Sequence, residues 1–156
     1  MRIGHGFDVH RLAPERRLIL GGIHIPYHLG LLGHSDADVL CHAISDAILG
    51  AAALGDIGQH FPDNDAAFKD ISSLLLLSKV LELIEQQHMR LYQVDSTIVA
   101  QKPKIAPFVK DIRLSLAQTM KIPVERVSVK ATTTEGLGFT GRGEGIAAHA
   151  VVLLND

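Results

Sequence analysis

The sequence predicts a single α/β domain, with helices packed on one face of a mixed sheet of four to five strands. Segments that alternate like strands and segments with helical periodicity succeed each other along the chain. The length of 156 residues suits one domain with a proper hydrophobic core. Because no internal repeat or low-complexity linker interrupts the chain, we expect residues 1–156 to form that one domain.

Each expected element rests on a local pattern. Residues 2–11 alternate like a strand, and Gly21 and Gly22 between apolar runs suggest a hairpin turn. Ser35, with Asp38 three residues later, resembles a capping box that starts a helix running to about residue 54. The other elements are expected in this order: a loop at 55–66, a helix at 68–89 that buries Ile71, Leu74, Leu77, Leu81 and Ile84, a strand at 94–100, a loop at 101–107, a helix at 107–121, a strand at 126–131, a glycine-rich loop at 132–145 and a strand at 146–154.

Charge and cysteine content narrow the classes of function. The net charge of −2 gives no general attraction for nucleic acid or for an acidic membrane. An anionic ligand would therefore need local groups or metal ions to supply positive charge. The single cysteine, Cys41, excludes an intrachain disulfide and fits a reducing compartment. Since no targeting segment precedes the first strand and every apolar run is shorter than a membrane span, we expect a soluble, cytoplasmic protein.

A first group of polar residues suggests a metal site. Asp8 and His10 point to one face of the first strand, since successive side chains alternate. On the first helix, His42 shares a polar face with Asp38 and Asp46, four residues to either side. Asp8, His10 and His42 would form the three-ligand set of a catalytic Zn²⁺ site, and Asp38 or Asp46 could orient the His42 ring. The alternative is a common surface pattern, because spacing alone does not show that strand and helix meet. The opposite face of the strand carries Ile3, Phe7 and Val9.

A second group suggests phosphate chemistry. The threonines at 132–134 leave a strand with backbone N–H groups and hydroxyls that suit a phosphate. A carboxylate next to them, Glu135, would repel the phosphate unless Mg²⁺ or Mn²⁺ lay between. The alternative is an ordinary strand end with a solvated glutamate.

Three further loops are open to two interpretations. The rigid loop at 101–107 could hold a base through main-chain hydrogen bonds, and the acidic loop at 55–66 could bind a polyol. Arg142 and Glu144, two residues apart, could form an ion pair at a subunit contact. A plain turn at 101–107 and a solvated loop at 55–66 are the simpler interpretations, and an ion pair at a subunit contact is the simple interpretation for Arg142 and Glu144.

Taken together, four ordered segments resemble the 2-C-methyl-D-erythritol 2,4-cyclodiphosphate synthase family: IGHGFDVHRL, HSDADVLCHAISDAILGAAALGDIGQHFPD, DSTIVAQKPKIAP and SVKATTTEGLGFTGRGEGIAA. The resemblance implies a bacterial cytoplasmic lyase of the methylerythritol phosphate route to isoprenoids. Such enzymes cyclise 4-diphosphocytidyl-2-C-methyl-D-erythritol 2-phosphate and release CMP. The resemblance also implies a homotrimer, with sheets toward the threefold axis and active sites between neighbouring subunits.

The resemblance assigns roles to individual residues. Asp8, His10 and His42 resemble the ligands of one Zn²⁺ per subunit, and Glu135 resembles the ligand of a Mg²⁺ or Mn²⁺ that accompanies the substrate diphosphate. The pair that stabilises the transition state is matched by His34 and Thr133. The residues expected to contact substrate or an axial isoprenoid diphosphate are Asp8, His10, His34, Ser35, Asp56, Ile57, Gly58, Phe61, Pro62, Asp63, Asn64, Asp65, Ala100, Gln101, Lys102, Pro103, Lys104, Ile105, Ala106, Ala131, Thr132, Thr133, Thr134, Glu135, Phe139 and Arg142.

Two positions depart from the family pattern. His149 stands where many members have an acidic residue, and Gly136 stands where a lysine is often found. Neither touches the expected metal ligands. Two other functions remain open for the same residues: a metal-dependent phosphohydrolase, in which the zinc site activates water, and a non-catalytic module that binds an isoprenoid diphosphate.

Overall fold

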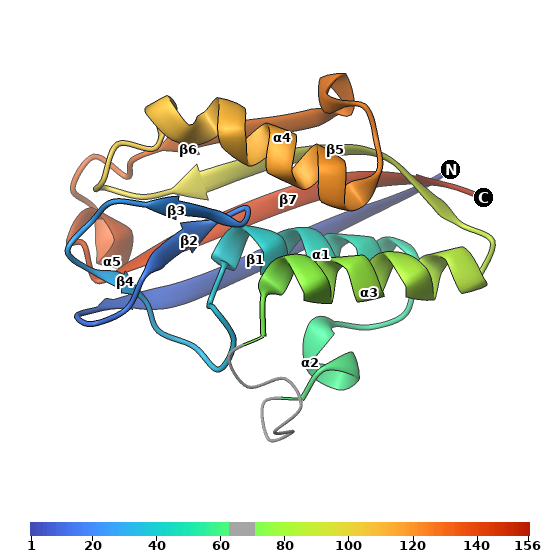
Figure 1. The fold of residues 1–156 in the computed structure, drawn as a ribbon, viewed down its shortest axis with the longest axis horizontal. Helices are drawn as coiled ribbons and strands as arrows, with labels where there is room; N and C mark the ends of the chain where they lie inside the picture. Colours follow the sequence, from blue (N-terminus) through green and yellow to red (C-terminus); the bar gives the residue numbers. More distant parts are fainter. Residues whose placement is uncertain (63–70) are drawn as a thin grey trace.

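A computed structural model of the chain, which describes residues 1–62 and 71–156, contains a five-stranded sheet in the order β4-β1-β7-β5-β6 (Figure 1). Strands β5 and β6 are parallel, and the other neighbours are antiparallel. A separate hairpin, β2-β3, turns at Gly21 and Gly22, as predicted. The strand bounds are Arg2–Ala13 (β1), Leu18–Leu20 (β2), Ile23–Ile25 (β3), Gly30–Leu31 (β4), Arg90–Val99 (β5), Val127–Thr132 (β6) and Gly145–Asn155 (β7).

The three longer helices cover one face of this sheet, which confirms the predicted mixed α/β architecture (Figure 1). Helix α1 packs on β1 and β7, α4 packs on β6, and α3 packs against both helices. None of the described helices is long and apolar enough to cross a membrane. The helix bounds are Val39–Ala51 (α1), Ile57–His60 (α2), Ser73–Gln86 (α3), Val109–Met120 (α4) and Gly138–Gly141 (α5), with 3₁₀ turns at Ala106–Phe108 (η2) and Val124–Arg126 (η3).

Two glycines bring α1 into backbone contact with β1. A Cβ at Gly6 would lie 1.9 Å from the carbonyl oxygen of Ala43, and one at Gly4 would lie 1.9 Å from that of Ala47. No side chain fits between the elements there, so strand and helix lie as close as their backbones allow. Asp8 and His10 follow on the same face of β1, which places them beside the first turns of α1.

The N-terminus of α1 differs from the prediction. The helix begins at Val39, and the carboxylate of Asp38 caps it by accepting from the N–H of Cys41 at 3.1 Å. Ser35 instead accepts from the N–H of Ala37 within the preceding turn. The expected capping box with Ser35 as N-cap is therefore wrong. The N-cap lies three residues later, at Asp38, which was predicted as the partner of Ser35 in the box.

Other boundaries shift by a few residues. Helix α3 begins at Ser73, so Ile71 lies before it, and Leu74 is half-buried. The rest of the predicted stripe is buried, namely Leu77, Leu81 and Ile84. A 3₁₀ turn occupies the predicted start of α4, and the short helices α2 and α5 lie in segments predicted as loops. The first and last residues of a helix depend on local hydrogen bonds, and hydrophobic periodicity does not predict these bonds.

The face of the sheet opposite α1 carries exposed apolar side chains. Ile3, Phe7 and Val9 of β1 are 71%, 47% and 42% exposed, as their alternation with Asp8 and His10 predicts, and Val151 of β7 is also exposed. By contrast, α1 is buried almost throughout, including Leu40, Ile44, Ile48 and Ala51. In the described part of the chain, the helices bury one face of the sheet, and these apolar side chains on the other face stay exposed.

Candidate active site

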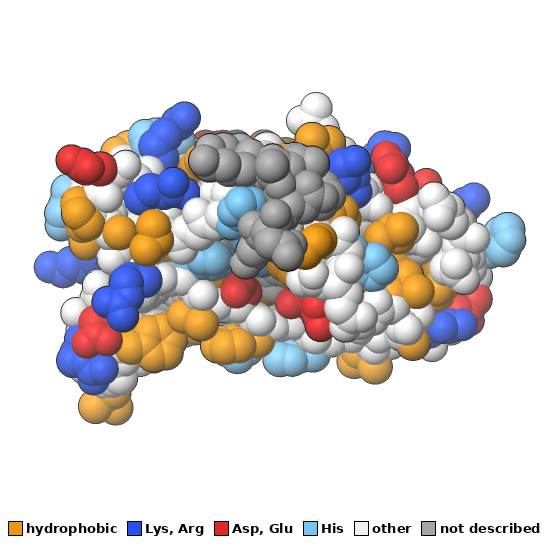
Figure 2. Space-filling view, turned by 90° about the horizontal axis from the view of Figure 1, so that it is seen from below, with side chains coloured by type: hydrophobic (Ala, Val, Ile, Leu, Met, Phe, Trp, Pro, Cys, Tyr) orange, Lys and Arg blue, Asp and Glu red, His pale blue; other side chains and the backbone are white. Residues whose placement is uncertain are grey.

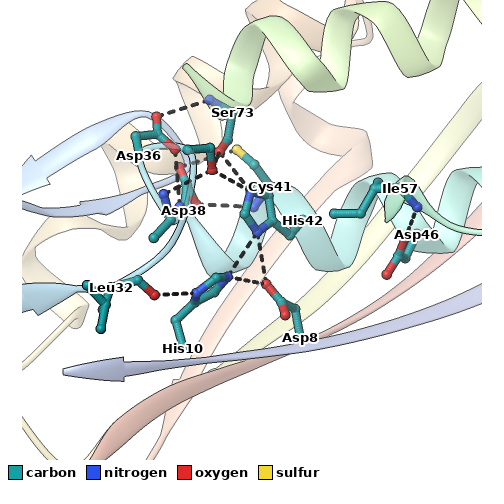
Figure 3. Close-up of polar contacts among 12 residues, drawn as sticks. Asp8, His10, Leu32, Asp36, Asp38, Cys41, His42, Asp46, Ile57 and Ser73 are labelled. Carbon is teal, nitrogen blue, oxygen red and sulfur yellow. Dashed lines mark hydrogen bonds and ion pairs between the residues drawn. The ribbon is translucent and has the colours of Figure 1, made fainter. Parts of the chain in front are cut away.

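Asp8 and His10 from β1 and His42 from α1 meet at one point, as predicted (Figure 3). One carboxylate oxygen of Asp8 lies 3.0 Å from His10 Nε2 and 3.0 Å from His42 Nδ1, and these two nitrogens are 3.1 Å apart. In the described part of the chain this is the group of ligand side chains that could hold a metal ion. His42 is buried, and the other two residues are half-buried.

The geometry of this triad fits a metal ion. Ligand atoms that surround a tetrahedral metal at about 2.0–2.1 Å lie about 3.3 Å from one another, close to the 3.0–3.1 Å separations of the triad. The donor set, two imidazole nitrogens and one carboxylate oxygen, is typical of catalytic sites with three protein ligands and an open fourth position.

Hydrogen bonds fix the tautomer of both imidazole rings. His10 Nδ1 lies 2.8 Å from the carbonyl oxygen of Leu32, so Nδ1 carries the proton and Nε2 keeps its lone pair. His42 Nε2 lies 3.0 Å from the hydroxyl of Ser73, and this hydroxyl donates to the carboxylate of Asp36. Because the Ser73 hydroxyl uses its one proton in the hydrogen bond to Asp36, the Ser73 oxygen must accept the hydrogen bond from His42 Nε2–H. Nδ1 of His42 is therefore the nitrogen available to a metal.

The expectation that Asp38 or Asp46 orients the His42 ring is wrong. Both ring nitrogens of His42 face other groups: Nδ1 faces the triad, and Nε2 faces the hydroxyls of Ser35 and Ser73. Asp46 accepts from the backbone N–H of Ile57 at 2.8 Å. Asp38 lies at the helix cap rather than on its face, and it accepts from the backbone N–H groups of Gly21, Gly22 and Cys41.

The surroundings of Asp8 favour its charged form. Burial by itself raises the pKa of Asp8. When no metal is bound and the two rings also carry protons on the nitrogens that face Asp8, their hydrogen bonds and charge outweigh burial and hold the pKa of Asp8 well below its usual value. Asp46 shows the opposite balance, because burial raises the pKa of its carboxyl. Asp8 is thus a carboxylate at neutral pH, as a metal ligand must be.

The triad opens into a cavity of about 190 Å³. Figure 2 views the molecule from the side on which α2 lies, and histidine and acidic side chains gather near the middle of this side. All but one of the lining residues belong to the predicted site; the lining residues are Asp8, His10, His34, Ser35, His42, Ile57, Gly58, Phe61 and Leu76.

Some residues of this site were missed by the sequence reasoning. Leu76 of α3 closes the cavity, Ser73 and Asp36 hold the His42 ring, and the Leu32 carbonyl holds the His10 ring. Every residue has a backbone carbonyl, so a sequence pattern cannot predict the role of the one at Leu32. Asp36 and Ser73 lie 37 residues apart in the chain, so no local pattern predicts their contact. A serine in the first turn of a helix was the one available signal, and it is typical of ordinary helix starts.

The segment that follows α1 is tied to the site through α2. Asp56 caps α2 and accepts from the backbone N–H and the side-chain amide of Gln59, both at 3.0 Å, and these hydrogen bonds lower the pKa of Asp56. Asp46 holds the next residue, Ile57, at the cavity wall. Three of the predicted substrate contacts lie outside the described residues: Asp63, Asn64 and Asp65.

The second predicted group lies at the C-terminal ends of β5 and β6. The N–H of Ala100 donates to the carbonyl of Thr132 at 2.9 Å, and the side-chain carbonyl of Gln101 accepts from the N–H of Gly136 at 3.2 Å. The loop at 100–106 and the loop after β6 therefore lie side by side, although each was predicted separately.

Within this group, Thr133 and Glu135 contact each other. The Thr133 hydroxyl accepts from the Glu135 N–H at 3.2 Å and lies 3.3 Å from its carboxylate. Glu135 has a φ of +53°, a left-handed conformation that is uncommon for a residue with a side chain. Both residues are exposed. Such local strain is frequent at functional sites, where it aims a side chain that a relaxed turn would direct elsewhere.

The two groups do not meet within one described chain. Val9, between Asp8 and His10 on β1, is in register with Thr132 of β6 through the intervening strands β7 and β5. Strand β1, which carries two of the triad residues, is therefore three strand spacings from the threonine loop, or about 14 Å. None of the described residues 100–106 or 131–135 lines the cavity of the triad. At the same sheet end, Arg142 beyond α5 pairs with Glu144 at 2.7 Å, and Phe139 of α5 is exposed.

The model of the YgbB family matches residues 1–155. The chain belongs to the YgbB family. A relative from Syntrophomonas wolfei, named 2-C-methyl-D-erythritol 2,4-cyclodiphosphate synthase, is 63% identical over 156 residues, which cover 100% of this chain and 99% of the relative.

Solved structures of similar proteins have the same fold as this YgbB family member. A 2C-methyl-D-erythritol-2,4-cyclodiphosphate synthase in its CDP-bound form superposes with a TM-score of 0.91 at 39% identity, over 99% of this chain and all of that one. The bifunctional IspDF of Campylobacter jejuni superposes with a TM-score of 0.94 at 44% identity. In the second case the match covers 98% of this chain and 42% of the bifunctional protein.

Proposed function

We propose that this chain converts 4-diphosphocytidyl-2-C-methyl-D-erythritol 2-phosphate into 2-C-methyl-D-erythritol 2,4-cyclodiphosphate and CMP, as a lyase of isoprenoid synthesis. Relatives with this enzyme's name match the chain over its full length. The CDP-bound relative supports a cytidylyl diphosphate substrate. The observation that carries the proposal is the triad of Asp8, His10 and His42, whose ligand atoms lie together beside a cavity lined mostly by residues predicted for this site.

Zinc is the metal that this triad suits best. Two neutral imidazoles and a carboxylate are a common zinc set, and both rings are held in the tautomer that a metal requires. A bound zinc ion supplies Lewis-acid polarisation of a phosphoryl oxygen. The chain's own contribution is to keep Asp8 charged and to keep the protons of His10 and His42 on the ring nitrogens that face away from the cavity.

The second group would bind the diphosphate and the cytidine. Glu135 would hold Mg²⁺ or Mn²⁺ against the diphosphate, and the backbone and hydroxyls at 132–134 would donate to phosphate oxygens. The loop at 100–106, joined to this segment by the hydrogen bond from Gly136 to Gln101, would hold the base. His34 from the cavity wall and Thr133 would stabilise the charge that develops in the transition state.

The reaction needs positioning rather than a general base. The nucleophile is an oxygen of the substrate's own 2-phosphate, whose second pKa of about 6 leaves it largely ionised near neutral pH. This oxygen would attack the β-phosphorus of the cytidine diphosphate, and the bond from that phosphorus to the CMP oxygen would break as CMP leaves. Cyclisation within one bound molecule also gains from proximity. No side chain has to remove a proton, which agrees with the way that His10 and His42 are already committed to the triad.

The complete site would form between copies of the chain in a homotrimer. The triad and the threonine loop lie about 14 Å apart in one chain, so a substrate that touches both needs the second group from a neighbour. The exposed apolar residues of the sheet, Ile3, Phe7, Val9 and Val151, would face the threefold axis. Phe139 and Arg142 would border an axial cavity that takes an isoprenoid diphosphate. A reducing bacterial cytoplasm fits the single buried Cys41.

Product analysis tests the activity. Purified protein would be incubated with the cytidylyl substrate, Zn²⁺ and Mg²⁺, and the products followed by ³¹P NMR. A cyclic diphosphate together with CMP is the expected result. Linear phosphate products would show a metal-dependent phosphohydrolase instead, and binding of an isoprenoid diphosphate without turnover would show a non-catalytic module.

Subunit mixing tests whether sites are shared. His42→Ala and Glu135→Gln chains, each expected to keep at most about 1% of wild-type activity alone, would be unfolded together, refolded at equal ratio and assayed. Because a site with both groups intact needs one chain of each kind in the correct order, random trimers should regain about a quarter of wild-type activity. Each variant refolded alone is the control. A self-contained site in every chain predicts no regained activity.

A further inference from the structure

The segment at 31–35, which connects β4 to the turn before α1, forms one wall of the triad's cavity. His34 and Ser35 line this cavity, and the carbonyl of Leu32 holds the His10 ring. On its other side the segment borders a second hollow of about 250 Å³, which Ser35 also lines. Ser35 thus lies between two open spaces, whereas at the start of the segment Leu31 is buried and the N–H of Leu32 donates to the carbonyl of Arg11 at 2.9 Å.

Arg16, which lies outside the segment, donates to three of its backbone carbonyls. The Nε of Arg16 donates to the carbonyl of Leu31 at 3.2 Å, and Nη2 donates to the carbonyls of Gly33 at 3.3 Å and Ser35 at 3.1 Å. Arg16 precedes β2, borders the second hollow and is half-buried. A planar guanidinium with several fixed N–H groups can bind three carbonyls at once, whereas a lysine ammonium cannot match the same spread.

These three hydrogen bonds leave the intervening carbonyl directed at the triad. With the carbonyls of Leu31 and Gly33 held by Arg16, the rigid peptide planes between them have little freedom to rotate. The carbonyl of Leu32 is directed instead to His10 Nδ1, at 2.8 Å. The same restraint limits where the next side chain, His34, can lie along the cavity wall.

We propose that Arg16 is a positioning residue of this active site, which holds the wall at 31–35 so that Leu32 orients the metal ligand His10 and His34 faces the cavity. The inference rests on the proposed function of the triad. Arg16 itself does not line the triad's cavity and acts only through the backbone of the wall.

The chain offers a matched control for this proposal. Arg17 is the next residue, carries the same charge, is exposed, and borders the same hollow. Arg16→Lys would be compared with Arg17→Lys, so that net charge is unchanged in both. Arg16→Gln serves as a second variant that keeps one donor without the charge. Circular dichroism and urea unfolding would confirm that each variant is folded.

The first measurement is zinc affinity, by competition with a chromogenic chelator. Loss of the contact that orients a ligating histidine should weaken zinc binding about tenfold in Arg16→Lys, with Arg17→Lys unchanged. The second is steady-state CMP release at saturating zinc, where kcat should fall more than KM rises, since the Arg16 substitution disturbs His34. The third is the ¹H–¹⁵N signal of His10 Nδ1–H in metal-free protein, which should broaden or shift only in the Arg16 variants.

The outcomes separate this inference from the proposed function. A folded Arg16→Lys protein whose zinc affinity, kcat and His10 signal all equal those of Arg17→Lys would overturn the role of Arg16. A wild-type protein that releases no CMP would overturn the proposed activity, while the zinc and NMR measurements would still decide the role of Arg16. Loss of stability without any change in the His10 signal would also count against the proposal, because it would show a merely structural role.

Discussion

The two halves of the candidate site are built in different ways. The triad stands on β1 and α1, which touch through the glycine contacts at Gly4 and Gly6, and each histidine is fixed by a hydrogen bond on its far side. The second half stands on loops after β5 and β6. Thr133 and Glu135 are exposed there, and a Cβ at Gly136 would meet nothing within 4 Å, although Ala100 and Ile105 of the first loop are buried.

This difference indicates what each half does. A metal ion bound by three side chains needs ligand atoms placed within tenths of an ångström, so its ligands stand on packed elements. In the proposed function, a flexible diphosphate, its cation and a neighbouring copy of the chain would bind to the second half, which could remain exposed until they arrive. The first half could therefore bind a metal ion by itself, whereas the second half, if the proposed trimer forms, would depend on assembly.

The largest effect is expected from the triad. His42→Ala removes one of the three side chains that would bind the metal ion, so the rate of cyclisation should fall by about 10³-fold or more. Zinc content, measured by plasma mass spectrometry on the dialysed protein, should fall with it. His24→Ala, at an exposed position on β3, is the control. If His42→Ala turned over substrate at the wild-type rate, the triad would have no part in catalysis. The proposed division between a metal-binding half and a diphosphate-binding half would then be wrong.

A substitution in the other half should separate catalysis from zinc binding. Glu135→Gln should lower kcat about 10²-fold and raise the Mg²⁺ concentration needed for activity, since the carboxylate that would hold the second cation is lost. Zinc content should stay at one ion per chain. A Glu135→Gln protein that loses zinc would show that the two halves are coupled rather than independent.

Stability should show the same contrast. Gly6→Ala places a methyl group against the backbone of α1, which should lower the free energy of unfolding by about 3 kcal/mol or more. Gly136→Ala meets no neighbour but has a φ of +79°, so its cost should be about 1–2 kcal/mol. Urea denaturation at one fixed protein concentration measures both. Equal costs would mean that the contact between β1 and α1 is looser than the structure shows.

The smallest effect on the site is expected from Ser73, which contacts His42 on the side away from the other two triad residues. Ser73→Ala removes the hydroxyl that links His42 to Asp36 and leaves Ser35 as the remaining hydroxyl near that nitrogen. Zinc affinity should fall about tenfold, as measured by chelator competition. Ser78→Ala, whose hydroxyl donates to the carbonyl of Leu74 within α3, is the matched control. Identical affinities in the two variants would show that Ser35 alone orients the ring.

Much of the fold follows from local patterns. Alternation in β1 predicted which residues face α1 and which face away, because the side-chain period of a strand leaves only these two directions. Gly21 and Gly22 predicted the β2-β3 turn for a similar reason, since both take positive φ values that other residues avoid. The start of α1 was misjudged because Ser35 and Asp38 are both good capping residues, and sequence spacing does not show which of them the chain uses.

The sequence by itself determined the residue types that this chemistry needs and the family to which the chain belongs. It also determined the face of each element, because helical and strand periods are local properties of the backbone. Only the tertiary structure decided that β1 and α1 lie close enough for Asp8, His10 and His42 to meet, and that Ser73, Asp36 and the Leu32 carbonyl hold the rings. It also decided that the threonine loop lies three strands away. Such contacts join residues that are distant along the chain, and no local pattern records the packing that brings them together.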